Sequence, residues 1–136
     1  MTRLRGMSRV GALGLAGFVL AAVPAFALGT GDLAALTKLE RGRWLVKDSE
    51  GTERQSVCIG DPMLLVQLEH GAGRCTREVV ANDATIGTVQ YSCPGRGFGH
   101  TTVRVETPRL AKIDTQGIVD GHPFGYRAEA RRLGGC

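Results

Sequence analysis

Apolar and polar residues alternate along much of the chain after position 42, as expected of strands that bury one face. Trp44 and Val46 take every second position of residues 43–47. The turn signal Ser-Glu-Gly at residues 49–51 then leads into residues 52–58. This pattern predicts a first β-hairpin.

A second hairpin is predicted around Asn82 and Asp83, two residue types that tolerate left-handed backbone in a turn. The predicted strands are residues 75–81 and 85–92. The residues expected to share one face of this hairpin are Val89, Tyr91 and Cys93.

The clearest alternation lies near the end of the chain, where Val103 and Val105 alternate with polar and charged residues. After a turn at Thr107-Pro108, the inward row continues at Ala111, Ile113 and Thr115. A primed turn is predicted at Asp120-Gly121, before a last strand with Phe124, Tyr126, Ala128 and Ala130 on its inner face.

Helical signals are confined to two short segments. Between residues 29 and 42, leucines recur at every third position, at Leu33, Leu36 and Leu39. Asp61-Pro62 is a good helix start, and Gly71 would end that helix. We therefore expect a mainly β (α+β) fold: an antiparallel β-meander or open barrel of about seven strands with one or two short helices.

Residues 1–27 are expected to form a cleavable signal peptide. Three arginines precede an apolar run over residues 10–23, and the small residues Ala25 and Ala27 match a signal-peptidase site before Leu28. A membrane anchor needs about 20 apolar residues, and the first cysteine, Cys58, lies too far along the chain for lipid attachment. We expect residues 28–136 to form a single disulfide-stapled domain in the periplasm, with no membrane anchor after cleavage.

Removal of the signal peptide also changes the net charge of the protein. Three of the 17 Lys and Arg residues leave with the signal peptide, whereas all 13 Asp and Glu residues stay. The mature domain is then nearly neutral, with charges that alternate in sign along the chain, so we expect no nucleic-acid partner.

The four cysteines, Cys58, Cys75, Cys93 and Cys136, all lie in the mature part, and an even number in an oxidising compartment predicts two disulfides. Sequence does not choose among the three possible pairings. We expect Cys58–Cys75 and Cys93–Cys136, because these pairs close local loops. No Cys-x-x-Cys knuckle is present, so we expect no metal site and no cofactor.

Five short features resemble an exported bacterial family of unknown function, number 3617. These are Leu-Glu-Arg-Gly-Arg-Trp at 39–44, a Cys followed by Asp-Pro at 58–62, Cys75, Tyr-Ser-Cys at 91–93 and a terminal Cys136. Members commonly have Pro where this chain has Arg41. The resemblance implies a Gram-negative periplasmic location and a four-cysteine sheet domain, and it supplies no catalytic residues.

The glycine-rich segment at residues 95–99 is the best candidate for a binding site. A phosphate cradle of this type would precede a helix, whereas this segment leads into a strand. We interpret it as a flexible loop between two strands. Arg96 and Phe98 would be exposed there, and an aromatic residue beside an arginine is typical of a contact loop.

No motif for catalysis is found in the sequence. His70, His100 and His122 stand apart, and we expect His70 at the carbonyl end of its helix and His122 in a turn. Most acids fit caps, turns or strand surfaces. The charged residues expected to pair across strands on a solvated face are Arg104, Glu106, Arg127, Glu129 and Arg131.

Three function classes remain. We favour a non-catalytic domain that binds an unknown protein or a small apolar ligand of the cell envelope, through loops or the mouth of its sheet. The second class is an inhibitor of a cell-wall hydrolase, because small periplasmic four-cysteine barrels of that kind also have strands that end in Tyr-x-Cys. A small periplasmic hydrolase is the third, and it lacks a recognisable nucleophile, base or metal cluster.

Overall fold

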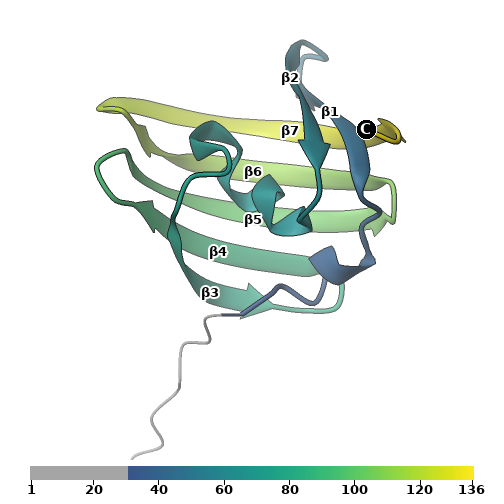
Figure 1. Cartoon of the computed structure of the whole chain (residues 1–136), viewed down its shortest axis with the longest axis horizontal. Coiled ribbons are helices and arrows are strands. Elements are labelled where there is room, and N and C mark those ends of the chain that lie inside the picture. The colour runs from purple at the N-terminus through teal and green to yellow at the C-terminus, as the bar shows by residue number, and fades with distance from the viewer. Residues whose placement is uncertain (1–30) are drawn as a thin grey trace, which may run out of the picture.

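The computed structural model describes residues 31–136, which form one antiparallel sheet of seven strands in the order β2-β1-β7-β6-β5-β4-β3 (Figure 1). The strands are β1 (Gly42–Asp48), β2 (Glu53–Ile59), β3 (Thr76–Asn82), β4 (Ile86–Cys93), β5 (Gly97–Thr107), β6 (Leu110–Val119) and β7 (His122–Gly134). The expected mainly β fold of about seven strands is confirmed. The predicted signal peptide lies outside the described residues.

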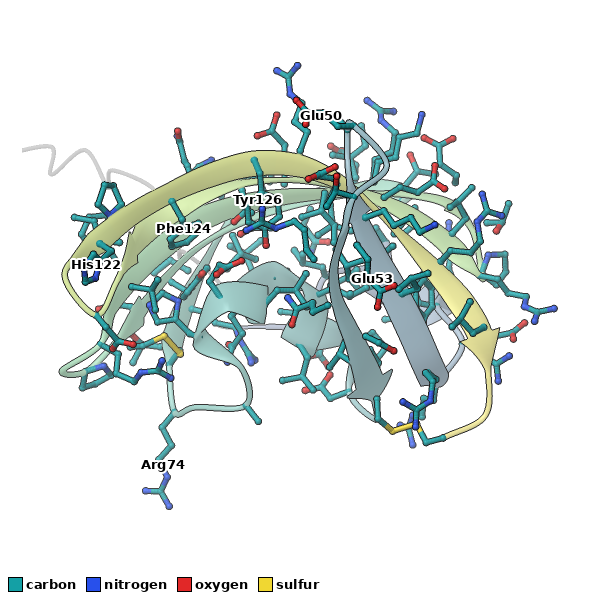
Figure 2. The ribbon with its side chains drawn as sticks, turned by 90° about the horizontal axis from the view of Figure 1, so that it is seen from above. Glu50, Glu53, Arg74, His122, Phe124 and Tyr126 are labelled. Carbon is teal, nitrogen blue, oxygen red and sulfur yellow. A yellow bond between two sulfur atoms is a disulfide. The ribbon has the colours of Figure 1, made fainter. Side chains whose placement is uncertain are left out.

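Strands β3 to β7 follow one another as a meander, and the β1–β2 hairpin attaches to the far side of β7. Strand β1 pairs antiparallel with β7, with Val46 opposite Ala130. Strands β2 and β3 each have one neighbour and form the two edges of the sheet. The sheet is therefore open, and it curves strongly around the short helices (Figure 2).

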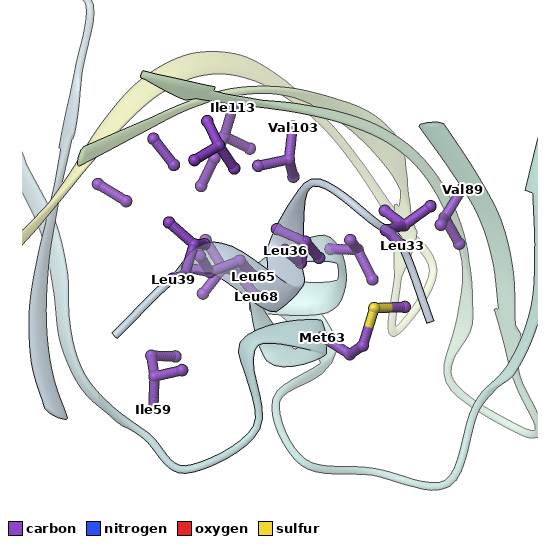
Figure 3. Close-up of a cluster of buried hydrophobic side chains, with 14 of the residues drawn as sticks. Leu33, Leu36, Leu39, Ile59, Met63, Leu65, Leu68, Val89, Val103 and Ile113 are labelled. Atoms are coloured by element: carbon purple, nitrogen blue, oxygen red, sulfur yellow. The ribbon is translucent and has the colours of Figure 1, made fainter. Parts of the chain in front are cut away.

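Two 3-10 helices, η1 (Leu36–Lys38) and η2 (Pro62–His70), lie in the concave side of the curved sheet (Figure 1). Their leucines meet the inner residues of the strands in one hydrophobic core (Figure 3). The every-third-residue spacing of Leu33, Leu36 and Leu39 suits a 3-10 turn, and all three are buried. At η2 the predicted cap is confirmed, because the Asp61 side chain accepts a hydrogen bond from the Met63 amide at 2.9 Å.

The local sequence signals of the sheet are confirmed. Val103, Val105, Ala111 and Ile113 are buried on the inner face, as alternation predicts. Asp120 and Gly121 both have positive φ, of 49° and 81°, as a primed hairpin turn requires. The inner face of the sheet meets the helices, and we call the opposite side the outer face.

The expected disulfide pairing is wrong. The bonds join Cys58 to Cys136 and Cys75 to Cys93, and the described residues contain no free cysteine. Cys75 precedes β3 and Cys93 ends β4, so that bond clamps a hairpin. Cys58 in β2 reaches Cys136 because β7 pairs with β1, the neighbour of β2. The expected Cys93–Cys136 bond does not form, since β6 and β5 lie between β7 and β4.

Oxidised cysteines indicate an oxidising environment, extracellular or periplasmic. Within residues 31–136, none of the helices has the length and apolar character to cross a membrane.

Candidate functional site

An exposed apolar pair lies on the outer face of the sheet. Phe98 in β5 pairs directly with Ile118 in β6, and the two residues are 49% and 36% exposed. Pro123 of β7 stands opposite Ile118 and continues the row. We call Phe98 and Ile118 the outer patch. Large apolar side chains side by side in solvent are the usual centre of a contact surface.

The outer patch lies between two hollows. One, of about 440 Å³, is lined by Gln90, His100, Gln116 and Phe124 in addition to the patch. The other, of about 330 Å³, lies on the β3 side of Phe98, where Thr76 and Glu78 line it. Phe98 lines both hollows, so it is the central residue of this part of the surface.

Phe98 is exposed, as we expected, but the prediction of a flexible loop around it is wrong. Residues 94–96 form the tight turn, and Phe98 belongs to strand β5. Gly97 and Gly99 lie on the inner face of that strand, where a Cβ on Gly99 would overlap the Tyr91 ring. Gly99 thus leaves room for a buried aromatic residue, whereas a Cβ on Gly97, whose φ is 124°, would overlap the backbone carbonyl of Ile118.

Arg96 is also exposed, but its guanidinium is already engaged. Its Nε and Nη2 donate to the two carboxylate oxygens of Asp120 at 3.2 and 3.1 Å, and its Nη1 donates to the His70 carbonyl at 3.1 Å. The hydrogen bond to Asp120 raises the pKa of Arg96, and the same bond lowers the pKa of the Asp120 carboxyl. Arg96 thus joins two turns to the end of η2, a structural role that the sequence did not reveal.

A polar cluster is buried on the inner face beneath the outer patch. His70 is only 2% exposed, and a 3.1 Å hydrogen bond links its Nδ1 to the Tyr91 hydroxyl. Thr101 and Thr115 form a second buried hydrogen bond, at 2.6 Å. Burial, with the charge of Glu69 as a smaller cause, raises the pKa of Tyr91 to about 12. His70 lies at the end of η2, as expected, and its side chain is part of the core.

Tyr126 extends this cluster toward β2. The Arg54 guanidinium lies 3.7 Å from the centroid of the Tyr126 ring and forms a 3.4 Å ion pair with Glu69. Burial is the main cause that raises the pKa of Tyr126 above its ordinary value of 10.0, and Glu69 adds to it. Arg54 covers the ring, and Glu69 holds the Arg54 guanidinium in place.

The buried cluster offers little chemistry to a substrate. His70 Nε2 and the Tyr126 hydroxyl have no hydrogen-bond partner, yet both atoms are buried. His100 lies on the outer face beside Gln90, and the His122 ring contacts the carbonyl of Asp120 at 3.0 Å. Residues 31–136 contain no group of three or more metal-ligating side chains.

Comparisons of the chain with protein-family models, curated proteins and solved structures gave no significant match. Fold and surface together define the class: a disulfide-bonded, open antiparallel sheet with a helical filling and an exposed apolar patch. The functional assignment therefore rests on the residues of this chain.

Proposed function

We propose that this chain is an exported, non-catalytic binding domain of the bacterial periplasm, and that it holds a protein partner against the outer patch. The observation that carries the proposal is the direct pairing of Phe98 and Ile118, both exposed, between two hollows. An aromatic residue with an aliphatic neighbour and a polar rim has the composition of an interface centre.

A protein partner fits the surface better than an internal apolar ligand. The concave side of the sheet is where a carrier of this shape would hold its cargo. Here that side is filled by side chains of the two helices and the segment before η1, including Leu33, Leu36 and Leu65, which are at most 2% exposed. The interior is thus a packed core, and the apolar surface that remains for binding is on the outside.

Inhibition of a cell-wall hydrolase is the second candidate. Residues 94–96 form a turn next to the outer patch, and Arg96 fixes this turn through Asp120. Inhibitors commonly present a rigid turn to their enzyme, because little conformational entropy is then lost on binding. A hydrolase is disfavoured, because His70 and the tyrosines are buried away from any substrate.

The periplasmic location is supported by the signal-peptide pattern at residues 1–27, the oxidised cysteines and the resemblance to family 3617. The intact mass of the exported protein tests it. A chain that begins at Leu28 agrees with cleavage, whereas a mass that retains residues 1–27 means that the apolar run is an anchor.

Site-specific photo-cross-linking tests the outer patch. A benzophenone side chain at position 98 should capture one partner in the native periplasm, and the same probe at Leu133, which is 54% exposed, should not. Affinity for the purified partner should fall by about tenfold or more in a variant with Phe98→Ala and Ile118→Ser. Unchanged affinity in that variant would refute the proposal.

Native mass spectrometry of the purified protein separates the alternatives. A hydrolase that co-purifies and loses activity in the complex supports the inhibitor. A lipid that co-purifies with the chain would instead mean that the core opens, and it would restore the apolar-ligand hypothesis.

A further inference from the structure

A third and larger hollow lies on the outer face, toward the other end of the strands. It has a volume of about 620 Å³ and lies between the β1–β2 turn and strands β5, β6 and β7. Glu50 marks the tip of that turn, which rises beyond the sheet (Figure 2). Sites for small molecules occupy about 300–1,000 Å³, so this hollow has the size of a ligand site.

Two cations stand side by side in this hollow. Arg104 of β5 is the direct cross-strand partner of Lys112 of β6, and both side chains are exposed. Like charges directly opposite each other destabilise a sheet. The expected cross-strand charge pairing is therefore wrong at Arg104, which faces another cation. A third cation, Lys47 of β1, lines the same hollow.

Each acid that lines the hollow has a polar partner. Asp114 forms a 2.9 Å ion pair with Arg127, and Glu129 forms one of the same length with Arg131. Asp48 accepts hydrogen bonds from the backbone amides of Glu50 and Thr52 and so shapes the β1–β2 turn.

In contrast, none of the three cations Lys47, Arg104 and Lys112 forms an ion pair with a carboxylate of residues 31–136. Glu129 is the direct cross-strand neighbour of both Lys47 and Lys112, so this row across the strands carries three cations and one carboxylate, and that carboxylate already pairs with Arg131. A multivalent oxyanion is the ligand that such an arrangement attracts, because several donors can share its charge.

We propose that Lys47, Arg104 and Lys112 form a binding site for the phosphate group of a polar organic molecule. The volume of the hollow exceeds that of a phosphate ion, so the rest of the ligand lies against the β1–β2 turn. This site is at the opposite end of the outer face from the outer patch and does not depend on it. The proposal also accounts for the like-charged neighbours, since a bound phosphate removes their repulsion.

Titration with inorganic phosphate at constant ionic strength, followed by NMR of the amide groups, tests the site. Chemical-shift changes should saturate and concentrate at these three residues. In the double variant Arg104→Gln/Lys112→Gln the affinity should fall by about tenfold or more. The matched control is Arg43→Gln/Arg74→Gln, which removes the same charge from exposed sites outside the hollow; Arg74 projects from the opposite side (Figure 2).

The thermal midpoint gives an independent readout. Without phosphate, the double variant should melt no lower than the wild-type protein, because the repulsion between Arg104 and Lys112 is gone. Added phosphate should raise the melting temperature of the wild-type protein and the control, but not that of the double variant. Glu129→Gln should increase the affinity for phosphate, since it removes the carboxylate that is the cross-strand neighbour of both Lys47 and Lys112.

Two further ligands distinguish the source of the phosphate. Tighter binding of glycerol phosphate than of inorganic phosphate indicates a soluble organic phosphate. Binding to phosphatidylglycerol vesicles, lost in the double variant, indicates a lipid headgroup. Equal shifts in the double variant and the control, or equal responses to phosphate and chloride, would overturn the proposal.

Discussion

Arg96 and Asp120 lie in two neighbouring hairpin turns and are joined in both directions. The Arg96 guanidinium donates to both carboxylate oxygens of Asp120, and the Asp120 amide donates to the Arg96 carbonyl at 2.7 Å. The third contact of Arg96, to the His70 carbonyl, ties both turns to the end of η2. Arg96 therefore holds the β4–β5 end of the sheet together, next to the outer patch.

Substitutions of Arg96 and Phe98 should differ in their effect on the stability of the fold. Arg96→Ala should lower the melting temperature, because three side-chain hydrogen bonds between turns are lost. Phe98→Ala should change the free energy of unfolding by only about 0.5 kcal/mol, since its ring is exposed. Thermal unfolding followed by circular dichroism measures both. A larger loss for Phe98→Ala than for Arg96→Ala would mean that Phe98 is a core residue.

Removal of the two disulfides should have unequal costs. The Cys58–Cys136 bond spans 78 residues and the Cys75–Cys93 bond 18. The chain-entropy model assigns about 4 kcal/mol to the first and about 3 kcal/mol to the second. Denaturation of the two double Cys→Ala variants measures these values. Peptide mapping of the unreduced protein checks the connectivity, and a peptide that links Cys58 to Cys75 would contradict the structure.

Local signals in the sequence were sufficient for the strands. Alternation placed Val103 and Val105 inside, and Asp120-Gly121 supplied the left-handed turn, because both depend on neighbours along the chain. The disulfide error arose where the chain closes over a long distance. Nothing near Cys58 indicates that β7 will return beside β1 and bring Cys136 to it.

The same limit applies to the candidate site. Exposure of Phe98 could be predicted from its neighbours, but the glycines around it were interpreted as flexible, when Gly99 makes room for Tyr91 and Gly97 for the Ile118 carbonyl. The position of His70 at the end of its helix could also be predicted, but its burial against Tyr91 depends on the curvature of the sheet. The pairing of Arg104 with Lys112 depends on register, which alternation alone does not specify.

The two tyrosines should make the protein sensitive to alkaline pH. Tyr91 and Tyr126 are the only tyrosines of the chain, and burial raises the pKa of both, that of Tyr91 to about 12. Because its pKa is higher in the folded state, the neutral Tyr91 hydroxyl contributes fully to the stability of the fold at pH values below the unfolded pKa of 10.0. This contribution is lost as the pH rises through 12.

Tyrosinate absorbance should therefore change little near pH 10 and rise together with unfolding at higher pH. The shift of Tyr91 corresponds to roughly 2–3 kcal/mol, and Tyr91→Phe should remove that part of the pH dependence. Half of the absorbance change centred at pH 10 in the folded protein would show that one hydroxyl is exposed.

Gly99→Ala should destabilise the fold from within the strand that carries the outer patch. A methyl group at this position would overlap the Tyr91 ring, and that ring cannot move aside because it is buried and its hydroxyl is held by His70. Overpacking of this kind costs about 1–3 kcal/mol. The matched control is Gly60→Ala, where a Cβ would meet no atom within 4 Å. Denaturant titration of both variants should show a lower free energy of unfolding only for Gly99→Ala. Equal stability of the two variants would mean that the glycines of β5 do serve flexibility, as the sequence had suggested.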